Sequence, residues 1–424
     1  MKVKCIYLLE KDRFISPFGD PVAEVLIENL PLHEFQRNLL APICPWIKRI
    51  KSVAEVEQFP CLLLEGDLYF TLSIIKKFVK RAKKLTTSGR LAHRLTVFHD
   101  KYLSFQELEV RFEQDEEIIL FPVWFLVFSA DLQRLSEINP VLVPVKERIV
   151  KPEMINRFLP EGESRELGIS RDVIFQITHW YHILLANIIS TVMIWLRLTP
   201  LRILRYIFWI LTAFSLNKWQ ILRRFRYIGR NCDIHPEARI ELSVIGDNVT
   251  IGRGAYIMCS IIGDNTTIDF EARLRNVVVG SNCMIAFSTI VNLATLYPGC
   301  LVSPPGLQLC VLGRNTFLAG GNYFIDLNLK KPIKVKHQGR IVPLKTNNMG
   351  VCVGHDVVLG IGSIIDAGVE IPNGILLIKD REQIIRKFAD DLPTGYPLVL
   401  KDGVVQKYIP PSPKSENRDE QNRP

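Results

Sequence analysis

The sequence predicts an α/β domain at the N-terminus and a left-handed parallel β-helix at the C-terminus, joined by apolar helices. Short apolar runs alternate with amphipathic stretches over residues 1–160, the most apolar part of the chain comes next, and an aliphatic residue then recurs every five or six positions. We place the apolar helices at 173–222, the β-helix at 228–378, a C-terminal segment at 379–409 and a disordered tail at 410–424.

Two runs at the start of the chain, KCIYLL (4–9) and CLLLEGDLYF (61–70), have the composition of buried strands. A helix should follow the second run. Its buried face would consist of Ile74, Ile75, Phe78, Val79 and Ala82, with lysines opposite. IILFPVWFLVFS (118–129) predicts another strand, interrupted by Pro122. Strands that alternate with helices indicate an α/β domain.

The apolar segment that follows has two interpretations. Its uncharged run at 183–196 contains 14 residues, fewer than the ~18–20 that a spanning helix needs, and Pro200 ends the helix. Basic residues follow it, namely Lys218, Arg223, Arg224, Arg226 and Arg230. This pattern favours a monotopic or re-entrant anchor, in which residues 173–230 meet a membrane surface. The alternative is a pair of buried helices that link the two domains.

The β-helix prediction depends on a six-residue rhythm. Aliphatic residues at 228, 234 and 240 recur at 245, 251 and 257 and again at 262, 268 and 274, so the pattern repeats every 17 residues. Three short strands would form each triangular coil, with the aliphatic side chains inside and glycine, aspartate or asparagine at corners of positive φ. Each coil pairs its backbone with the next one, so the core grows by stacking.

The repeat is interrupted between about 290 and 350, where residues 322–348 predict an excursion with a hairpin across HQG. Loops that leave a rigid scaffold often carry function, so we expect the site here. Lys334, Lys336, Arg340 and Lys345 belong to a basic run that would bind phosphates or form a solvated face. Asn347 and Asn348 would bind an acceptor amide or hydroxyl, or form a turn.

At 228–377 the repeat resembles the hexapeptide-repeat acyltransferases. The whole layout resembles the bifunctional sugar-1-phosphate nucleotidyltransferase/acetyltransferases, whose nucleotidyltransferase-like domain would be degenerate here. The resemblance implies a homotrimer and a coenzyme A thioester, or an acyl carrier protein, as donor. CLLLEGDLYFT resembles the strand that ends in a metal-holding aspartate, here Asp67.

At the positions of the family's two active sites, this sequence departs from the family's motifs. The loop EKDRFISPFGDP lacks the glycine-rich run that cradles a triphosphate. We therefore expect nucleotidyl transfer to be lost, Asp67 to be a vestige or a helix cap, and no metal to be bound. The family's histidine base corresponds to the vicinity of Asn348, and asparagine cannot take a proton. His355, in VGHDVVLG, is the tentative base or else a coil corner, and His337 would lie at the tip of the excursion.

Composition limits the partners and the compartment. The 424 residues are 48% hydrophobic, and their net charge of +9 favours anionic partners. No nucleic-acid motif is present, so a small-molecule or lipid-linked substrate is expected. Nine cysteines without a CxxC pair indicate buried thiols in a reducing compartment. The short apolar run at the N-terminus is not typical of a secretory signal, so we expect a cytoplasmic protein at the inner face of the membrane.

The sequence therefore predicts a membrane-associated acyltransferase. It would move an acyl group to an amine or hydroxyl of a sugar or a lipid-linked acceptor. Two alternatives stay open, namely a non-catalytic trimeric membrane scaffold and a residual sugar-1-phosphate nucleotidyltransferase.

Overall fold

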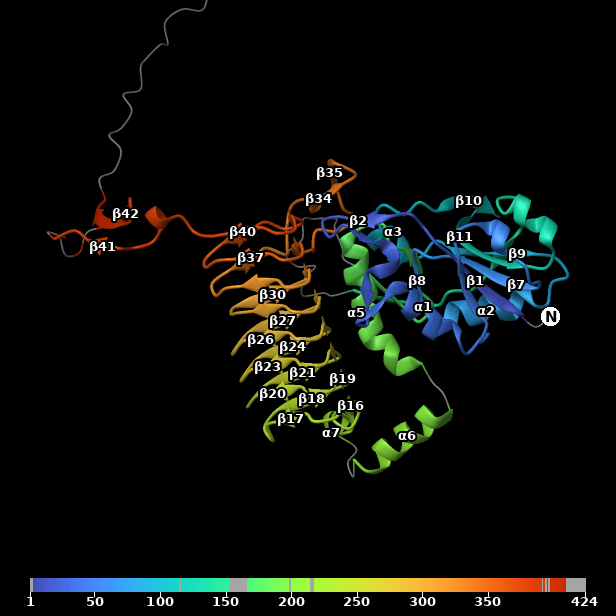
Figure 1. Ribbon diagram of the computed structural model, residues 1–424, viewed down its shortest axis with the longest axis horizontal. Helices are drawn as coiled ribbons and strands as arrows, with labels where there is room; N and C mark the ends of the chain where they lie inside the picture. Colours follow the sequence, from blue (N-terminus) through green and yellow to red (C-terminus); the bar gives the residue numbers. More distant parts are fainter. Residues whose placement is uncertain are drawn as a thin grey trace, which may run out of the picture. The chain divides into compact units, whose positions relative to one another are not determined.

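The computed structural model describes residues 3–113, 116–151, 166–197, 200–213, 217–390, 392, 395 and 397–408. The chain forms two compact units, Met1–Leu376 and Leu377–Pro424. The first unit contains the α/β domain, the helical segment and nearly all of the β-helix (Figure 1). The tail predicted to be disordered, at 410–424, lies outside the described residues.

A mixed sheet forms the centre of the α/β domain. Its strands lie in the order β12-β9-β11-β7-β1-β6, with β10 paired to β11. Their bounds are β1 (Cys5–Leu9), β6 (Ile47–Ile50), β7 (Cys61–Glu65), β9 (Gly89–Arg94), β10 (Glu109–Glu113), β11 (Glu116–Leu126) and β12 (Pro140–Leu142). β1 is parallel to β6 and β7, whereas β11 is antiparallel to β7 and β9. The register of β11 on β9 shifts between Leu120 and Trp124, around Pro122, which has no N–H to donate.

Helices and small hairpins complete this domain. The helices are α1 (Leu32–Leu40), α2 (Leu72–Ala82), α3 (Val97–Tyr102) and the 3₁₀ turns η1 (Val22–Glu24), η2 (Val53–Glu55) and η3 (Ser129–Arg134). The paired short strands are β2 (Phe14–Ile15) with β3 (Asp20–Pro21), β4 (Leu26–Ile27) with β5 (Leu30–Pro31), β13 (Glu147–Val150) with β14 (Leu167–Ser170), and β8 (Leu68–Phe70) with β15 (Ile174–Gln176). Because β15 pairs with β8, the domain extends beyond residue 160.

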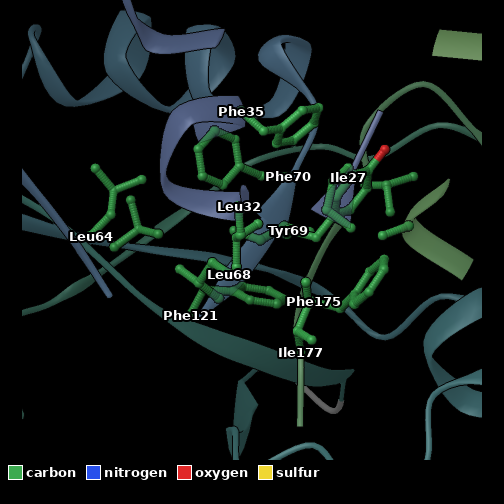
Figure 2. Packing of buried hydrophobic residues seen from close by; sticks show 14 of the residues in the cluster. Ile27, Leu32, Phe35, Leu64, Leu68, Tyr69, Phe70, Phe121, Phe175 and Ile177 are labelled. Carbon is green, nitrogen blue, oxygen red and sulfur yellow. The ribbon is translucent and has the colours of Figure 1, made fainter. Parts of the chain in front are cut away.

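The core of the domain is apolar and aromatic. α2 buries the five residues predicted for its inner face, which confirms that prediction. Phe35 and Tyr69 stack with ring centroids 5.7 Å apart, and Phe121 and Phe175 are fully buried in the same cluster (Figure 2).

The apolar segment divides into helices with different environments. α5 (Trp180–Leu196) is largely buried: Asn187 Nδ2 donates to the Leu26 carbonyl of the α/β domain, and Trp195 Nε1 donates to the Leu242 carbonyl of the β-helix. α6 (Pro200–Leu211) is mostly exposed, and α7 (Lys218–Leu222) follows it. Among the described helices, no single one is long and apolar enough to cross a membrane. α5 and α6 reach that length and composition only as a pair bent by 81°.

Three parallel sheets stack along the β-helix (Figure 1). The first contains β16 (Arg226–Ile228), β19 (Ser243–Ile245), β22 (Ile261–Ile262), β25 (Val278–Val279), β28 (Thr295–Leu296), β31 (Val311–Leu312), β36 (Cys352–Val353) and β39 (Glu370–Ile371). The second contains β17 (Asp233–Ile234), β20 (Thr250–Ile251), β23 (Thr267–Ile268), β26 (Met284–Ile285), β29 (Leu301–Val302), β32 (Phe317–Leu318), β37 (Val358–Leu359) and β40 (Leu376–Leu377). The third contains β18 (Arg239–Glu241), β21 (Tyr256–Met258), β24 (Arg273–Arg275), β27 (Ile290–Asn292) and β30 (Gly306–Gln308).

The pairing confirms the predicted repeat. Ile245 pairs with Ile262, one period later, and the interior side chains of Ile251 and Ile268 are buried. Stacked parallel strands of this kind are consistent with the predicted left-handed β-helix.

Corners of positive φ are occupied by asparagine and glycine, as predicted, for example at Gly254 (69°) and Gly299 (80°), but the glycines that directly follow the sheet strands have a different role. Positive φ falls on asparagine, as at Asn248 (57°) and Asn265 (54°), and not on the neighbouring Gly246 and Gly263. A Cβ on Gly263 would lie 2.6 Å from the carbonyl carbon of Gly280, so these glycines allow one coil to approach the next.

The excursion leaves the stack between β32 and β36. β31 nevertheless pairs directly with β36, so the coils continue in register. Within the excursion, β33 (Tyr323–Phe324) pairs with β38 (Ile364–Ile365), and β34 (Lys334–His337) forms the predicted hairpin with β35 (Arg340–Pro343). The second unit contains η4 (Arg381–Gln383) and a small sheet of β41 (Lys387–Phe388), β43 (Val404–Lys407) and β42 (Leu398–Lys401).

Candidate functional site

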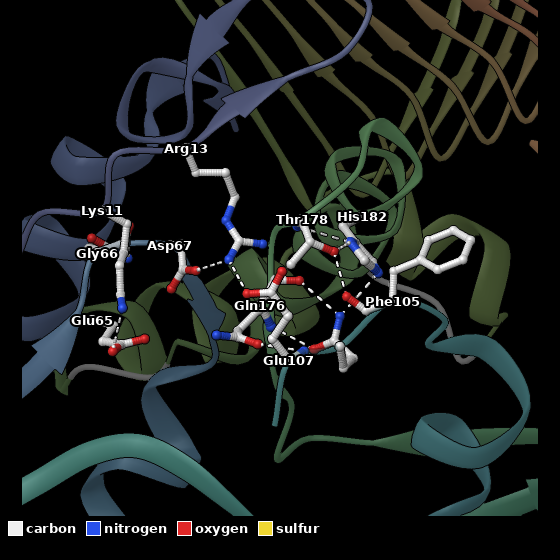
Figure 3. Close-up of polar contacts among 12 residues, drawn as sticks. Lys11, Arg13, Glu65, Gly66, Asp67, Phe105, Glu107, Gln176, Thr178 and His182 are labelled. Carbon is white, nitrogen blue, oxygen red and sulfur yellow. Dashed lines mark hydrogen bonds and ion pairs between the residues drawn. The ribbon is translucent and has the colours of Figure 1, made fainter. Parts of the chain in front are cut away.

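Asp67 lies just beyond the carboxyl end of β7, where polar residues from several loops gather (Figure 3). Its side chain is fully buried, and neither carboxylate oxygen accepts a hydrogen bond from any described residue. Burial and the nearby charge of Glu65 raise the pKa of Asp67 to about 7, although Arg13 and Lys11 oppose this shift. A buried carboxyl group that accepts no hydrogen bond is costly to fold, and such groups cluster at functional sites.

Arg13, from the loop after β1, lies between two carboxylates. Its Nη2 atom is 3.6 Å from Asp67 Oδ2 and 2.5 Å from Glu107 Oε2. Beside it, Lys11 Nζ is 2.7 Å from Glu65 Oε1. The guanidinium supplies a fixed positive charge between Asp67 and Glu107. Among the described residues, no group of three or more His, Cys, Asp and Glu side chains is arranged to hold a metal ion.

Buried hydrogen bonds hold the loop that carries Glu107. The backbone N–H of Glu107 donates to Gln176 Oε1 at 3.0 Å, and Gln106 Nε2 donates to the Gln176 carbonyl at 3.0 Å (Figure 3). His182 Nδ1 accepts the Thr178 N–H, which leaves its Nε2–H to donate to the Ser104 carbonyl at 3.1 Å. Burial keeps the pKa of His182 well below the ordinary histidine value, so this imidazole is a neutral structural group.

The excursion brings His337 to this cluster. The His337 ring stacks on Phe105 with centroids 4.1 Å apart and planes 7° apart, and the Lys336 carbonyl lies 3.0 Å from His179 Nε2. Partial burial and then His179 lower the pKa of His337, with Arg13 acting in the same direction and Glu107 opposing. Its ring nitrogens form no hydrogen bond with any other described residue. The imidazole is therefore neutral near pH 7 and can accept a proton.

The other predicted binding residues lie on the same excursion. Lys334, Lys336, Arg340 and Lys345 are exposed, whereas Ile333 and Val335, on either side of Lys334, are buried. The excursion is also tied to the α/β domain through the Lys345 N–H, which donates to Ser104 Oγ at 3.0 Å.

Asn347 and Asn348 lie at the base of the excursion. The Asn347 carbonyl accepts the Asn328 N–H at 2.9 Å, and Asn348 forms a β-bridge with Leu327. Their backbones therefore close the excursion through a bridge and a hydrogen bond to residues near its start. An acceptor-binding role for their side chains stays a prediction.

His355 lies in a different contact, where a late coil meets the β2–β3 loop. Its Nδ1 atom accepts the Arg314 N–H at 2.8 Å, so Nε2 carries the proton and donates to Asp20 Oδ2 at 3.2 Å. Burial alone would raise the pKa of Asp20, but His355 and Arg314 hold it below the ordinary aspartate value. The ring also stacks on Phe18 at 5.0 Å. The base role of His355 stays a prediction, and it requires the imidazole to leave these partners.

Sequence reasoning missed Glu107, Phe105 and the role of Asn187 in docking α5. No local motif marks them, because each meets its partners only after distant segments pack together. It also missed an apolar cavity of about 260 Å³, formed by α3, β14, α5 and the β-helix. Its lining includes Phe98, Ile169, Ile188, Val192 and Asn276.

A comparison with known protein families agrees with the repeat. Residues 221–304 match the family model described as the GMPPB C-terminal domain. No curated protein matches the chain. Among 116 matching chains of solved structures is a hexapeptide transferase family protein from Anaplasma phagocytophilum, with 18% identity, coverage of 36% of this chain and 72% of that chain, and a TM-score of 0.21. The family match and the three stacked sheets support the resemblance of residues 228–378 to the hexapeptide-repeat domains of transferases.

Proposed function

We propose that the protein is an acyltransferase whose catalytic base is His337. The acyl donor would be a coenzyme A thioester or an acyl carrier protein, and the acceptor an amine or hydroxyl on a sugar or a lipid-linked molecule. The observation that carries the proposal is the position of His337: a hairpin that the coils do not need holds this imidazole on the Phe105 ring, near enough to Arg13 and Glu107 for their charges to act on its pKa in opposite directions.

The reaction needs one proton acceptor and a site for anionic groups. The acceptor's nitrogen or oxygen attacks the thioester carbonyl, its proton passes to His337, and the carbon–sulfur bond breaks to release a thiol after the sulfur takes up a proton. The exposed cations Lys334, Lys336 and Arg340 lie on the hairpin that carries the base. They would hold the donor's phosphates near it.

The test measures donor binding and turnover separately. Calorimetry with coenzyme A and acetyl-coenzyme A measures binding, and release of free thiol with amino-sugar, sugar-phosphate and glycolipid acceptors measures transfer. We expect His337→Gln to lower turnover about 100-fold or more while donor affinity stays within about twofold. Lys334→Gln/Lys336→Gln should weaken donor binding. The matched control is His235→Gln, on an early coil, which should change neither quantity.

Two results would change or contradict the proposal. If coenzyme A did not bind at millimolar concentration, a coenzyme A donor would be ruled out and the carrier-protein donor would be left. If His355→Gln abolished turnover without loss of stability while His337→Gln did not, the base would be His355, as the sequence first indicated.

The non-catalytic scaffold is the second candidate, and the Arg13 contacts favour it. Arg13 occupies the space between Asp67 and Glu107, and Asp20 and Arg314 engage His355. Under this alternative the wild type and every variant above would be inactive in the transfer assay and would bind no donor. The homotrimer and the location at the inner membrane face stay predictions. Light scattering after size-exclusion chromatography would test the first, and fractionation of cells would test the second.

A further inference from the structure

Helix α6 exposes the side chains that a soluble helix would bury. Leu201, Leu204, Phe208 and Leu211 are 70%, 66%, 61% and 68% exposed, and their spacing places them on one face. Ile203, Ile207 and Ile210 widen this face and are 44–48% exposed. We call these residues the apolar face of α6. An apolar surface of this kind on a protein normally marks an interaction site.

The opposite face of α6 packs on the rest of the protein. Tyr206 donates to the Trp195 carbonyl at 3.2 Å, and Trp209 lies 5.5 Å from Phe225 between ring centroids. Arg205 lies over the Tyr227 ring at 5.3 Å, and Arg202 donates to the Ile194 carbonyl at 3.0 Å. The two arginines, Tyr206 and Trp209 of α6 therefore contact the rest of the protein, and this packing sets the outward direction of the apolar face.

A basic cavity lies next to this helix. Its volume is about 670 Å³, and its lining includes Ala213, at the end of the α6 segment, together with Arg223, Arg224, Arg226 and Arg239. The same aromatic residues that hold α6, Phe225 and Tyr227, flank Arg226 in the sequence.

Most of the positive charge in this cavity is uncompensated. Arg223 lies 3.7 Å from Glu241, and the lining carboxylate Glu237 pairs with Arg253 outside the cavity. Arg224, Arg226 and Arg239 form no ion pair with any described carboxylate. Partial burial and then Arg224 lower the pKa of Arg226, as happens when cations are held together without an anion.

We propose that α6 lies flat on a bilayer, with its apolar face in the acyl region and anionic lipid headgroups in the basic cavity. The 12 residues of α6 extend about 18 Å, too short for the ~30 Å hydrocarbon core, so the helix rests in the interface. An apolar face beside clustered arginines is the combination that anionic bilayers bind. The buried α5 does not take part.

The experiment is flotation of the full chain with vesicles of phosphatidylcholine alone or with about one third phosphatidylglycerol. We expect strong binding to the anionic vesicles only. Leu204→Glu/Phe208→Glu should weaken it at least about 100-fold. Arg224→Gln/Arg226→Gln should weaken it about 25-fold, since each basic residue near an anionic surface contributes about fivefold. The controls are Ile361→Glu/Ile364→Glu on a late coil, also exposed, and Arg94→Gln/Arg134→Gln in the α/β domain.

Several outcomes would overturn the proposal. Equal binding to both vesicle types would remove the role of the arginines. If the wild type did not bind vesicles, or if Leu204→Glu/Phe208→Glu bound them as strongly as the wild type, the proposed membrane contact of α6 would be refuted. If this variant instead converted an oligomer to a monomer in size-exclusion chromatography, a second copy of the chain would cover the face. Vesicle binding needs no acyl donor and donor binding needs no vesicle, so this inference and the proposed acyl transfer can fail separately.

Discussion

Replacing Asp67 with asparagine should remove one cause of the fall in the free energy of unfolding as the pH rises. The carboxyl group has a pKa of about 7 in the folded protein and about 3.9 in an unfolded chain. Between these values the folded state holds a proton that the unfolded state has lost, so the contribution of Asp67 to stability falls as pH rises and is lost fully above about pH 7. An asparagine side chain at this position would have no charge to bury, and it keeps the shape of the aspartate.

The magnitude follows from the pKa difference. A pKa difference of about 3 corresponds to about 4 kcal/mol at pH 8, of which roughly 2–3 kcal/mol develops between pH 5 and pH 8. No discount for solvent applies, because the side chain is fully buried. Asp67→Asn should therefore gain about 2–3 kcal/mol relative to the wild type when the pH is raised from 5 to 8.

The assay is hydrogen exchange of the β1 and β7 amides together with urea unfolding at both pH values. The comparison between pH values cancels the cost of the buried amide, which is the same in each. Glu137→Gln, at an exposed position, is the control and should show no difference. A difference between Asp67→Asn and wild type that is equal at pH 5 and pH 8 would show that Asp67 ionises normally, and it would refute the argument that burial outweighs the charges of Arg13 and Lys11 at this carboxyl group.

Two further predictions concern buried histidines and the coil corners. Burial lowers the pKa of His93 to about 4 and that of His99 to about 3, so the unfolded state binds more protons below about pH 6.5. Stability should fall by about 4–5 kcal/mol from pH 6.5 to 4.5, and urea unfolding of His93→Asn/His99→Asn should show a flatter pH profile. Gly263→Ala should cost about 1–3 kcal/mol, because its Cβ would meet backbone atoms 2.6 Å away, whereas Asn265→Gly, at φ 54°, should cost less than about 1 kcal/mol. Thermal unfolding would compare the two, and equal losses would contradict the assignment of close approach to the glycine and positive φ to the asparagine.

The features that the sequence predicted correctly are local or periodic. The 17-residue rhythm predicted strand pairs such as Ile245 with Ile262, because stacking repeats one local pattern. The buried face of α2 followed from helical spacing in the same way. The corner glycines show the limit of this reasoning: Gly263 is required by its distance to the next coil, which no single coil reveals.

The candidate site could be predicted only in part. The excursion and its hairpin were visible because the repeat stops there, and His337 was visible as a residue at its tip. The ring partners of His337 were not visible, since Phe105 and His179 come from segments more than one hundred residues earlier in the sequence. His355 illustrates the opposite case, in which a histidine with a plausible position for catalysis is engaged by Asp20 and Arg314 once the domains pack.

The apolar segment separates most clearly what each level determines. Its composition alone predicted two helices with basic residues after them, and could not distinguish a core helix from a membrane-facing one, because burial in protein and burial in lipid select the same side chains. Tertiary packing decided this differently for the two helices. α5 has its Asn187 and Trp195 bonded to the domains on either side, whereas α6 turns Tyr206 and Trp209 inward and leaves its leucines exposed. The hydrophobic pattern thus specified that both helices need an apolar environment. Only the fold determined that the protein itself provides this environment for α5 and not for the apolar face of α6.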